Sequence, residues 1–333
     1  MSKNQFKAMV LRQEGVHTAH SIEHLTESDL PEGDVLVDVD YSSLNFKDAL
    51  AIIGSGKIVR TWPMIPGVDL AGTVRSSESV AYSVGDQVVL TGWGVGERHW
   101  GGYTQRQRVR SEWLVPLPDG LDTKKAMAIG TAGFTAMLCV MRLESAGITP
   151  ESGKVLVTGA AGGVGSVAIS ILSNLGYDVT ALTLPQQTEI HDCLRELGAN
   201  EIICGAEWQD SPKPLETQNW SAAIDTVGTH VLARVISTMN YSGVVASCGL
   251  AGGADLPITV MPFILRGVSL LGVDSVMCPT EHRVKVWQRV VKDLPDSALT
   301  SINRTAALEE MPDLSEKMLS GRLRGRIVVD VNA

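Results

Sequence analysis

Cysteine is absent from the first 125 residues of this 333-residue chain, and the five cysteines beyond them are scattered. A sparse, odd-numbered set predicts reduced thiols rather than a disulfide framework, as is typical of the cytoplasm. Histidine is also scarce in the first 125 residues, where only His99 lies beyond the N-terminal stretch, without a ligand pair beside it. Zinc needs three or four N, S or O ligands, so we expect no metal site.

Basic residues are not in excess, since 28 Lys and Arg stand against 37 Asp and Glu. The formal net charge of −9 argues against nucleic acid or an anionic membrane surface as the main partner. The N-terminus lacks the apolar core of a secretion signal, and no stretch is long and apolar enough to span a bilayer. We therefore expect a cytoplasmic protein with no membrane partner.

The most informative segment that is present lies at residues 155–183. A short run with strand character leads into a glycine-rich turn at 159–165, then into an apolar helical stripe and a second strand. This order predicts the start of a βαβ unit that binds a dinucleotide, with the pyrophosphate at the helix N-terminus. The turn residues expected to contact the cofactor are Ala161, Gly162, Gly163 and Val164.

The chain changes character along its length. Residues 1–125 read as short strands separated by turns, whereas strands and helices alternate from residue 126 onward, which favours a doubly wound parallel sheet. We expect an α/β protein with a β-rich catalytic domain at 1–125, a nucleotide-binding domain at 126–266, and a final segment at 267–333. The last strand, at 326–331, is expected to return to the first domain.

Several dispersed runs carry a resemblance to a known family. Residues 43–48, 65–74 and 129–136 resemble the zinc-free quinone oxidoreductase branch of the medium-chain dehydrogenase/reductase superfamily. Residues 90–97, 261–268 and 272–276 are more narrowly similar to its acrylyl-CoA reductase (AcuI/YhdH-like) group. The resemblance implies a GroES-like β-rich domain followed by a Rossmann domain, and a homodimer formed at the strand near 268–273. Zinc-dependent relatives carry Cys at the place of Asn45 and Gly-His-Glu at that of residues 67–69.

The resemblance further implies NADPH-dependent reduction of acrylyl-CoA to propionyl-CoA, and hence a CoA thioester as the small-molecule partner. A quinone or enone reductase of the same branch is the alternative enzyme. A catalytically silent NADPH-binding protein is the alternative outside enzymes. Lys57 and Arg60 are candidates for binding the CoA phosphates, although a solvated loop is the more ordinary interpretation of two isolated charges.

Asn45 and Tyr41 are the catalytic candidates, and by resemblance Asn45 and Phe46 face the nicotinamide. The competing interpretation makes Asn45 an ordinary helix cap with Lys47 and Asp48 solvated. Tyr41 is equally consistent with strand packing. No residue qualifies as a clear general acid, so solvent is expected to supply the proton.

The second strand of the nucleotide unit ends at Thr183 with no Asp or Glu to bind a ribose 2′-OH, which favours NADPH over NADH. Related reductases carry an arginine just beyond this strand, whereas this chain has Pro185, Gln186 and Gln187. Three further cofactor contacts are expected after later strands or near the C-terminus: Leu250, Ser275 and Arg326. For Arg326, a surface arginine beside the last strand is the competing interpretation.

Overall fold

The computed structural model describes residues 5–185 and 188–333, which form two units. Unit 1 contains the residues up to Thr131 together with Ser275–Val291 and Ile302–Ala333. Unit 2 contains Ala132–Asp274 and Lys292–Ser301. Relative to the expected boundaries at 125 and 266, unit 1 continues to Thr131 and unit 2 continues to Asp274.

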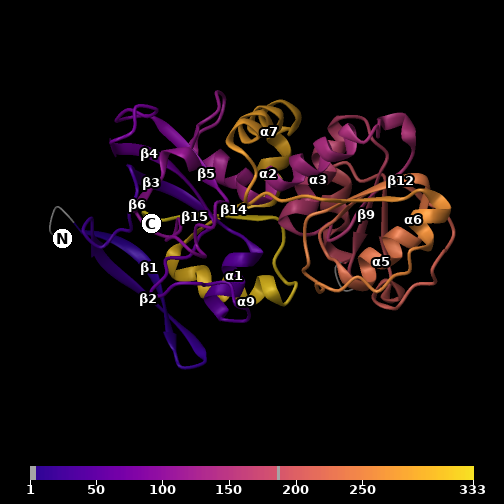
Figure 1. The fold of residues 1–333 in the computed structure, drawn as a ribbon, viewed down its shortest axis with the longest axis horizontal. Coiled ribbons are helices and arrows are strands. Elements are labelled where there is room, and N and C mark those ends of the chain that lie inside the picture. Colours follow the sequence, from indigo (N-terminus) through magenta and orange to yellow (C-terminus); the bar gives the residue numbers. More distant parts are fainter. Residues whose placement is uncertain (1–4, 186–187) are drawn as a thin grey trace. The chain divides into compact units, whose positions relative to one another are not determined.

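Unit 1 is built on a mixed sheet of seven strands, ordered β14-β15-β3-β4-β5-β7, with β6 paired to β3 (Figure 1). Apolar residues of this sheet and of β1 share one buried core, which also includes residues of two helices. The strands are β1 (Gln5–Glu14), β2 (His17–Thr26), β3 (Val35–Leu44), β4 (Asp69–Ser77), β5 (Gln87–Thr91), β6 (Arg106–Val109), β7 (Val115–Pro116), β14 (Asn303–Ala307) and β15 (Arg326–Asp330). Antiparallel pairing of β15 with β3 confirms that the chain returns to its first domain.

Unit 2 is a six-stranded parallel sheet ordered β10-β9-β8-β11-β12-β13, the doubly wound arrangement of a Rossmann domain. Its strands are β8 (Val155–Val157), β9 (Val179–Thr183), β10 (Glu201–Cys204), β11 (Trp220–Asp225), β12 (Met239–Ser247) and β13 (Ser269–Gly272). The doubly wound parallel sheet predicted from residue 126 onward is thus confirmed.

Helices complete both units. They are α1 (Phe46–Ile53), α2 (Thr123–Ser145), α3 (Gly163–Asn174), α4 (His191–Glu196), α5 (Thr229–Ser237), α6 (Met261–Arg266), α7 (Thr280–Asp293), α8 (Asp296–Ile302) and α9 (Met311–Leu319). Within unit 1, α9 packs beside α1 (Figure 1).

Helix α2 corrects one expectation, because its length and apolar composition suffice to cross a membrane. The statement that no stretch reaches this limit is wrong for α2. However, 83% of its most apolar window is buried inside the protein, as in the core helix of a globular fold. The helix is kinked at Gly130, whose φ of 52° and ψ of −160° are not helical.

Candidate active site

The glycine turn of unit 2 has the geometry of an anion site. Gly162 precedes the first residue of α3, a helix of 12 residues. The first N–H groups of a helix have no carbonyl within the helix to bond, and the helix dipole adds positive potential there. A Cβ on Gly165 would overlap the carbonyl of Gly159 and lie 2.8 Å from the Cα of Ala160. Only glycine therefore allows the helix and the turn to approach this closely.

A buried carboxylate fixes the neighbouring strand ends. Thr158 donates its hydroxyl to Asp225 Oδ1 at 2.8 Å, and the Gly228 N–H donates to Asp225 Oδ2 at 2.9 Å. Burial raises the pKa of the Asp225 carboxyl above its ordinary value. The Thr226 N–H donates to the Thr158 hydroxyl at 3.0 Å. These bonds join the ends of β8 and β11, so Asp225 shapes the edge where a dinucleotide binds in this class of sheet.

The end of β9 carries the residues expected near the adenosine ribose. Thr183 is buried, and its hydroxyl lies 3.3 Å from His191 Nε2. The sequence analysis looked beyond this strand for an arginine and overlooked His191. Gln186 and Gln187 lie outside the described residues. Leu250, after β12, is 61% exposed.

Asp69 is the centre of a buried polar cluster in unit 1. Its side chain is fully buried, and both oxygens accept hydrogen bonds. Oδ1 accepts the Ser43 N–H at 2.9 Å, and Oδ2 accepts the Ser43 hydroxyl at 2.7 Å. Oδ2 also accepts Asn45 Nδ2 at 3.0 Å and the Thr131 N–H at 2.9 Å. The kink at Gly130 brings the last of these donors to the carboxylate.

Arg326 supplies the positive charge of this cluster. It is only 2% exposed, so its interpretation as a surface arginine is wrong. The guanidinium donates to the Ser43 hydroxyl at 2.7 Å, to Asn45 Oδ1 at 3.2 Å and to the Ala128 carbonyl at 3.1 Å. A Cβ on Gly130 would overlap this guanidinium. Burial lowers the pKa of Arg326 from its ordinary value, while the charge of Asp69 raises it.

Asn45 is both a cluster member and the N-cap residue of α1. Its Nδ2 group lies within hydrogen-bond distance of the Ser43 carbonyl at 3.2 Å and of Asp69 Oδ2 at 3.0 Å. The two amide hydrogens thus have partners inside the protein, which favours a role in positioning the cluster.

Asp48 belongs to the same region, and the interpretation that leaves it solvated is wrong. It is 1% exposed and accepts the N–H groups of Asn45, Gly67 and Val68 at 2.9, 3.1 and 3.0 Å. Burial, followed by the charge of Asp69, raises the pKa of Asp48 to about 7. Buried Tyr103 donates its hydroxyl to the Ser43 carbonyl at 3.4 Å. Sequence reasoning missed Tyr103, although the preceding Gly101-Gly102 pair marks a close backbone approach.

Tyr41 lies on β3 two residues before Ser43, and none of the hydrogen bonds described above for the cluster involves it. It is separated from Asn45 by roughly 13 Å along the strand, at about 3.3 Å per residue. Its ring lies 6.0 Å from the Lys124 ammonium, and burial raises the pKa of its phenol, as do the carboxylates of Asp330 and Asp40. Phe46, the first residue of α1, is 38% exposed and is available to a ligand.

A group of cations surrounds Glu97 in unit 1. The carboxylate of Glu97 lies 3.1 Å from Lys47 Nζ, 3.7 Å from Arg60 Nε and 3.6 Å from Arg98 Nε. Three positive charges against one leave a net positive patch on an acidic protein. Lys57 is exposed in the loop that leads to Arg60.

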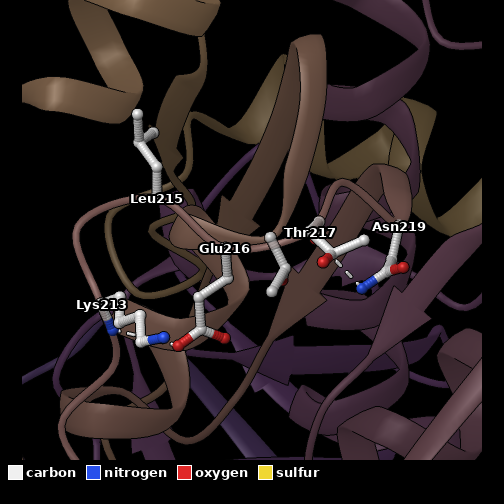
Figure 2. A pocket seen from close by; sticks show the side chains of 6 residues that line it. Lys213, Leu215, Glu216, Thr217 and Asn219 are labelled. Carbon is white, nitrogen blue, oxygen red and sulfur yellow. Dashed lines mark hydrogen bonds between the residues drawn. The ribbon is translucent and has the colours of Figure 1, made fainter.

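Figure 2 shows a pocket of about 420 Å³ in unit 2, lined by Lys213, Leu215, Glu216, Thr217, Asn219 and Thr238. Asn219 directly precedes β11 and Thr238 directly precedes β12. The pocket therefore lies at the amino ends of the parallel strands, opposite the edge where dinucleotides bind. Among residues 5–185 and 188–333, no group of three or more His, Cys, Asp or Glu is arranged to bind a metal ion.

Comparison with known proteins places this architecture in a family. An alcohol dehydrogenase GroES-like domain matches residues 31–119, and a zinc-binding dehydrogenase domain matches residues 163–292. The chain is 55% identical to a probable acrylyl-CoA reductase AcuI of Escherichia coli, covering 98% of this chain and 100% of the relative. It is 53% identical to an acrylyl-CoA reductase AcuI of Ruegeria pomeroyi, with the same coverage.

Among solved structures, the yhdH oxidoreductase of Salmonella enterica in complex with NADP superposes with a TM-score of 0.95 at 54% identity, covering 97% of this chain and 99% of that one. The chain therefore belongs to the medium-chain dehydrogenase/reductase superfamily, within its acrylyl-CoA reductase (AcuI/YhdH-like) group.

Proposed function

We propose that this protein reduces the C=C bond of acrylyl-CoA to give propionyl-CoA, with NADPH as reductant. The observation that carries the proposal is the full-length similarity to two acrylyl-CoA reductases. The proposed chemistry is a conjugate reduction, in which the β-carbon gains a hydride and the α-carbon gains a proton. The π electrons move transiently onto the thioester oxygen, so the protein must supply hydrogen-bond donors there.

The residues of unit 2 fit an NADPH molecule, which supplies the hydride when bound. The backbone at Ala161, Gly162, Gly163 and Val164 would bind the pyrophosphate through N–H groups at the start of α3. Thr183 would lie at the adenosine ribose, where its hydroxyl and His191 offer donors to a 2′-phosphate.

We assign Leu250, Ser275 and Phe46 to the nicotinamide side of the cofactor. Arg326 and Asn45 would support this region through the buried cluster in unit 1, since their polar atoms bond to Ser43 and to each other. The assignment of Tyr41 as a catalytic residue stays a prediction, and unchanged kinetics of Tyr41→Phe would remove it.

The cations around Glu97 would bind the phosphates of the CoA moiety. Lys47, Arg60 and Arg98 lie within 4 Å of that carboxylate, so their charges are held together on one surface. Replacing both Arg60 and Arg98 with Gln should raise KM for acrylyl-CoA about tenfold at low ionic strength, because about two favourable charge contacts are lost. KM for a small enone without phosphates should not change.

A side-by-side assay tests the proposed function against its alternatives. NADPH oxidation is measured with acrylyl-CoA, crotonyl-CoA and 1,4-benzoquinone, and each assay is repeated with NADH. We expect fast turnover of acrylyl-CoA with NADPH. Fast reduction of the quinone with none of acrylyl-CoA would instead identify a quinone reductase, and NADPH binding without turnover of any acceptor would identify a silent binding protein.

We further propose a homodimer in the cytoplasm. Strand β13 is the last strand of the parallel sheet, with two of its four residues exposed, and its outer edge is free to extend the sheet of a second copy. Five free cysteines are consistent with a reducing compartment. Sedimentation at micromolar concentration would test the dimer, and a monomer with full activity would refute it.

A further inference from the structure

Trp93 has an unusual backbone for a bulky residue. Its φ is +57°, and it lies between Gly92 at +80° and Gly94 at +77°. The left-handed region costs a residue with a Cβ about 1–2 kcal/mol. Such a conformation persists only where the surroundings impose it, and it is often associated with a functional constraint.

Arg283 and the segment 275–278 impose this conformation. The Trp93 N–H donates to the Val276 carbonyl at 2.9 Å, and the Arg283 guanidinium lies 4.9 Å from the centre of the indole ring. Arg283 is 1% exposed and donates to Thr91 Oγ1 at 2.9 Å and to the Val276 carbonyl at 2.7 Å. The indole is thus held by a cation that is itself fixed by several hydrogen bonds.

The indole N–H of Trp93 is buried and has no hydrogen-bond partner among residues 5–185 and 188–333. A buried donor without a partner costs about 1–3 kcal/mol. Trp220 Nε1 is also buried without a hydrogen-bond partner, but Trp220 lies in the apolar core of unit 2 and does not have a positive φ. Of these two tryptophans, Trp93 alone combines the unpaired donor with a positive φ.

The position of Trp93 relates the donor to the candidate active site. The Gly92 N–H donates to the Val68 carbonyl at 3.1 Å, and Thr91 pairs with Asp69 across β5 and β4. On its other side, Trp93 is bonded to Val276, the neighbour of the predicted cofactor residue Ser275. Trp93 therefore lies between a strand that borders the Asp69 cluster and a predicted cofactor segment. Its indole N–H, unlike its backbone N–H, has no partner within the described residues.

We propose that the Trp93 indole N–H donates a hydrogen bond to the carbonyl oxygen of the acyl thioester substrate. The inference rests on the proposed function, since it requires an enoyl thioester as the acceptor. Negative charge grows on that oxygen as the β-carbon gains the hydride, and a prepositioned donor stabilises it. Arg283 is a positioning residue, because it holds the ring and polarises its N–H.

The test combines NMR and kinetics on the full-length enzyme. In ¹⁵N-labelled wild-type protein, the resonance of one of the seven tryptophan indoles should move downfield on saturation with propionyl-CoA, a non-reacting product. Trp93→Phe, or Trp93→Tyr if the first variant does not fold, assigns that resonance. Trp93→Phe keeps an aromatic ring and should lower kcat for acrylyl-CoA about 100-fold, the usual effect of losing one such donor. Trp220→Phe, the matched control, should leave kcat unchanged.

The outcomes separate the two proposals. Suppose that the wild-type protein turns over acrylyl-CoA normally. This inference alone would then be overturned if the Trp93 indole resonance did not move, or if kcat of Trp93→Phe stayed within twofold of wild type. A wild-type protein that reduces no acyl thioester would refute the proposed function, and the Trp93 assignment with it.

Discussion

Replacing Arg326 with Met removes the cation of the buried cluster while keeping a side chain of similar length. Four hydrogen bonds are lost, to the Ser43 hydroxyl, to Asn45 Oδ1 and to the carbonyls of Leu44 and Ala128. Asp69 then stays fully buried with no positive charge close to it. The variant thus tests whether the cluster depends on charge compensation or on packing alone.

The expected magnitude follows from the burial of both partners. Removing one member of a buried charge arrangement costs about 3–5 kcal/mol, because the remaining charge is uncompensated. For a domain of the size of unit 1, each kcal/mol shifts Tm by about 2–4 °C. We therefore expect Arg326→Met to lower Tm of unit 1 by about 6–20 °C. Adding Asp69→Asn should recover part of the loss, since it removes the uncompensated charge.

Calorimetric or fluorescence melting measures the effect, with Arg304→Met as the matched control. Arg304 is on the neighbouring strand β14 and pairs with Glu310 at 3.1 Å, but both side chains are about half exposed. An exposed pair of this kind contributes at most about 1 kcal/mol. Two results would refute charge compensation. The first is an Arg326→Met variant whose Tm falls no more than that of Arg304→Met. The second is an Arg326→Met/Asp69→Asn double variant whose fall in Tm equals the sum of the two single falls.

Three further predictions concern pH, the cofactor and metal. The pKa of Asp48 is raised to about 7, so the folded state keeps a proton that the unfolded state releases near the ordinary pKa of an aspartate. The free energy of unfolding should therefore fall by about 3 kcal/mol from pH 4 to 7, and Asp48→Asn should abolish this slope in urea titrations. Gly165→Ala should weaken NADPH binding at least tenfold, measured by fluorescence titration, because the new Cβ would overlap backbone atoms. Gly56→Ala is the matched control and should bind NADPH normally, because a Cβ there contacts only side chains at 3.7 Å or more. Incubation with a zinc chelator should leave kcat unchanged, and a loss restored by zinc would contradict the metal-free site.

The Rossmann part of the fold was predictable because its signals are local. A strand, a glycine turn and a helix stripe lie within 30 residues, so their order and spacing can be read directly from the sequence. Gly165 illustrates this, since its close approach to Gly159 involves residues only six positions apart. His191 was overlooked because the strand end was searched for arginine, although it lies only eight residues beyond Thr183.

The buried cluster of unit 1 was only partly predictable, because its contacts join distant parts of the chain. Arg326 and Ser43 are 283 residues apart in sequence, and Tyr103 and Ser43 are 60 apart. The resemblance indicated Asn45, and the place of Arg326 near the C-terminus indicated that residue, but no sequence pattern pairs the two. Asp48 was misjudged for the same reason: a carboxylate in the first turn of a helix is usually solvated, and only the loop at Gly67 and Val68 buries it.

The donor arrangement around Asp69 explains how this cluster relates to the chemistry of the group. Each Asp69 oxygen already accepts a short hydrogen bond, and Arg326 balances its charge, while the raised pKa of Asp48 keeps that carboxyl largely protonated below pH 7. A metal ion could bind Asp69 only by displacing Ser43 or Asn45 and by adding positive charge to a cluster that is already close to neutral. Such a cluster is suited to holding the backbone around it rigid, rather than to polarising a carbonyl as a Lewis acid. Stabilising the thioester oxygen then falls to neutral N–H donors, and an enoyl thioester suits such donors because conjugation already activates its C=C bond toward hydride.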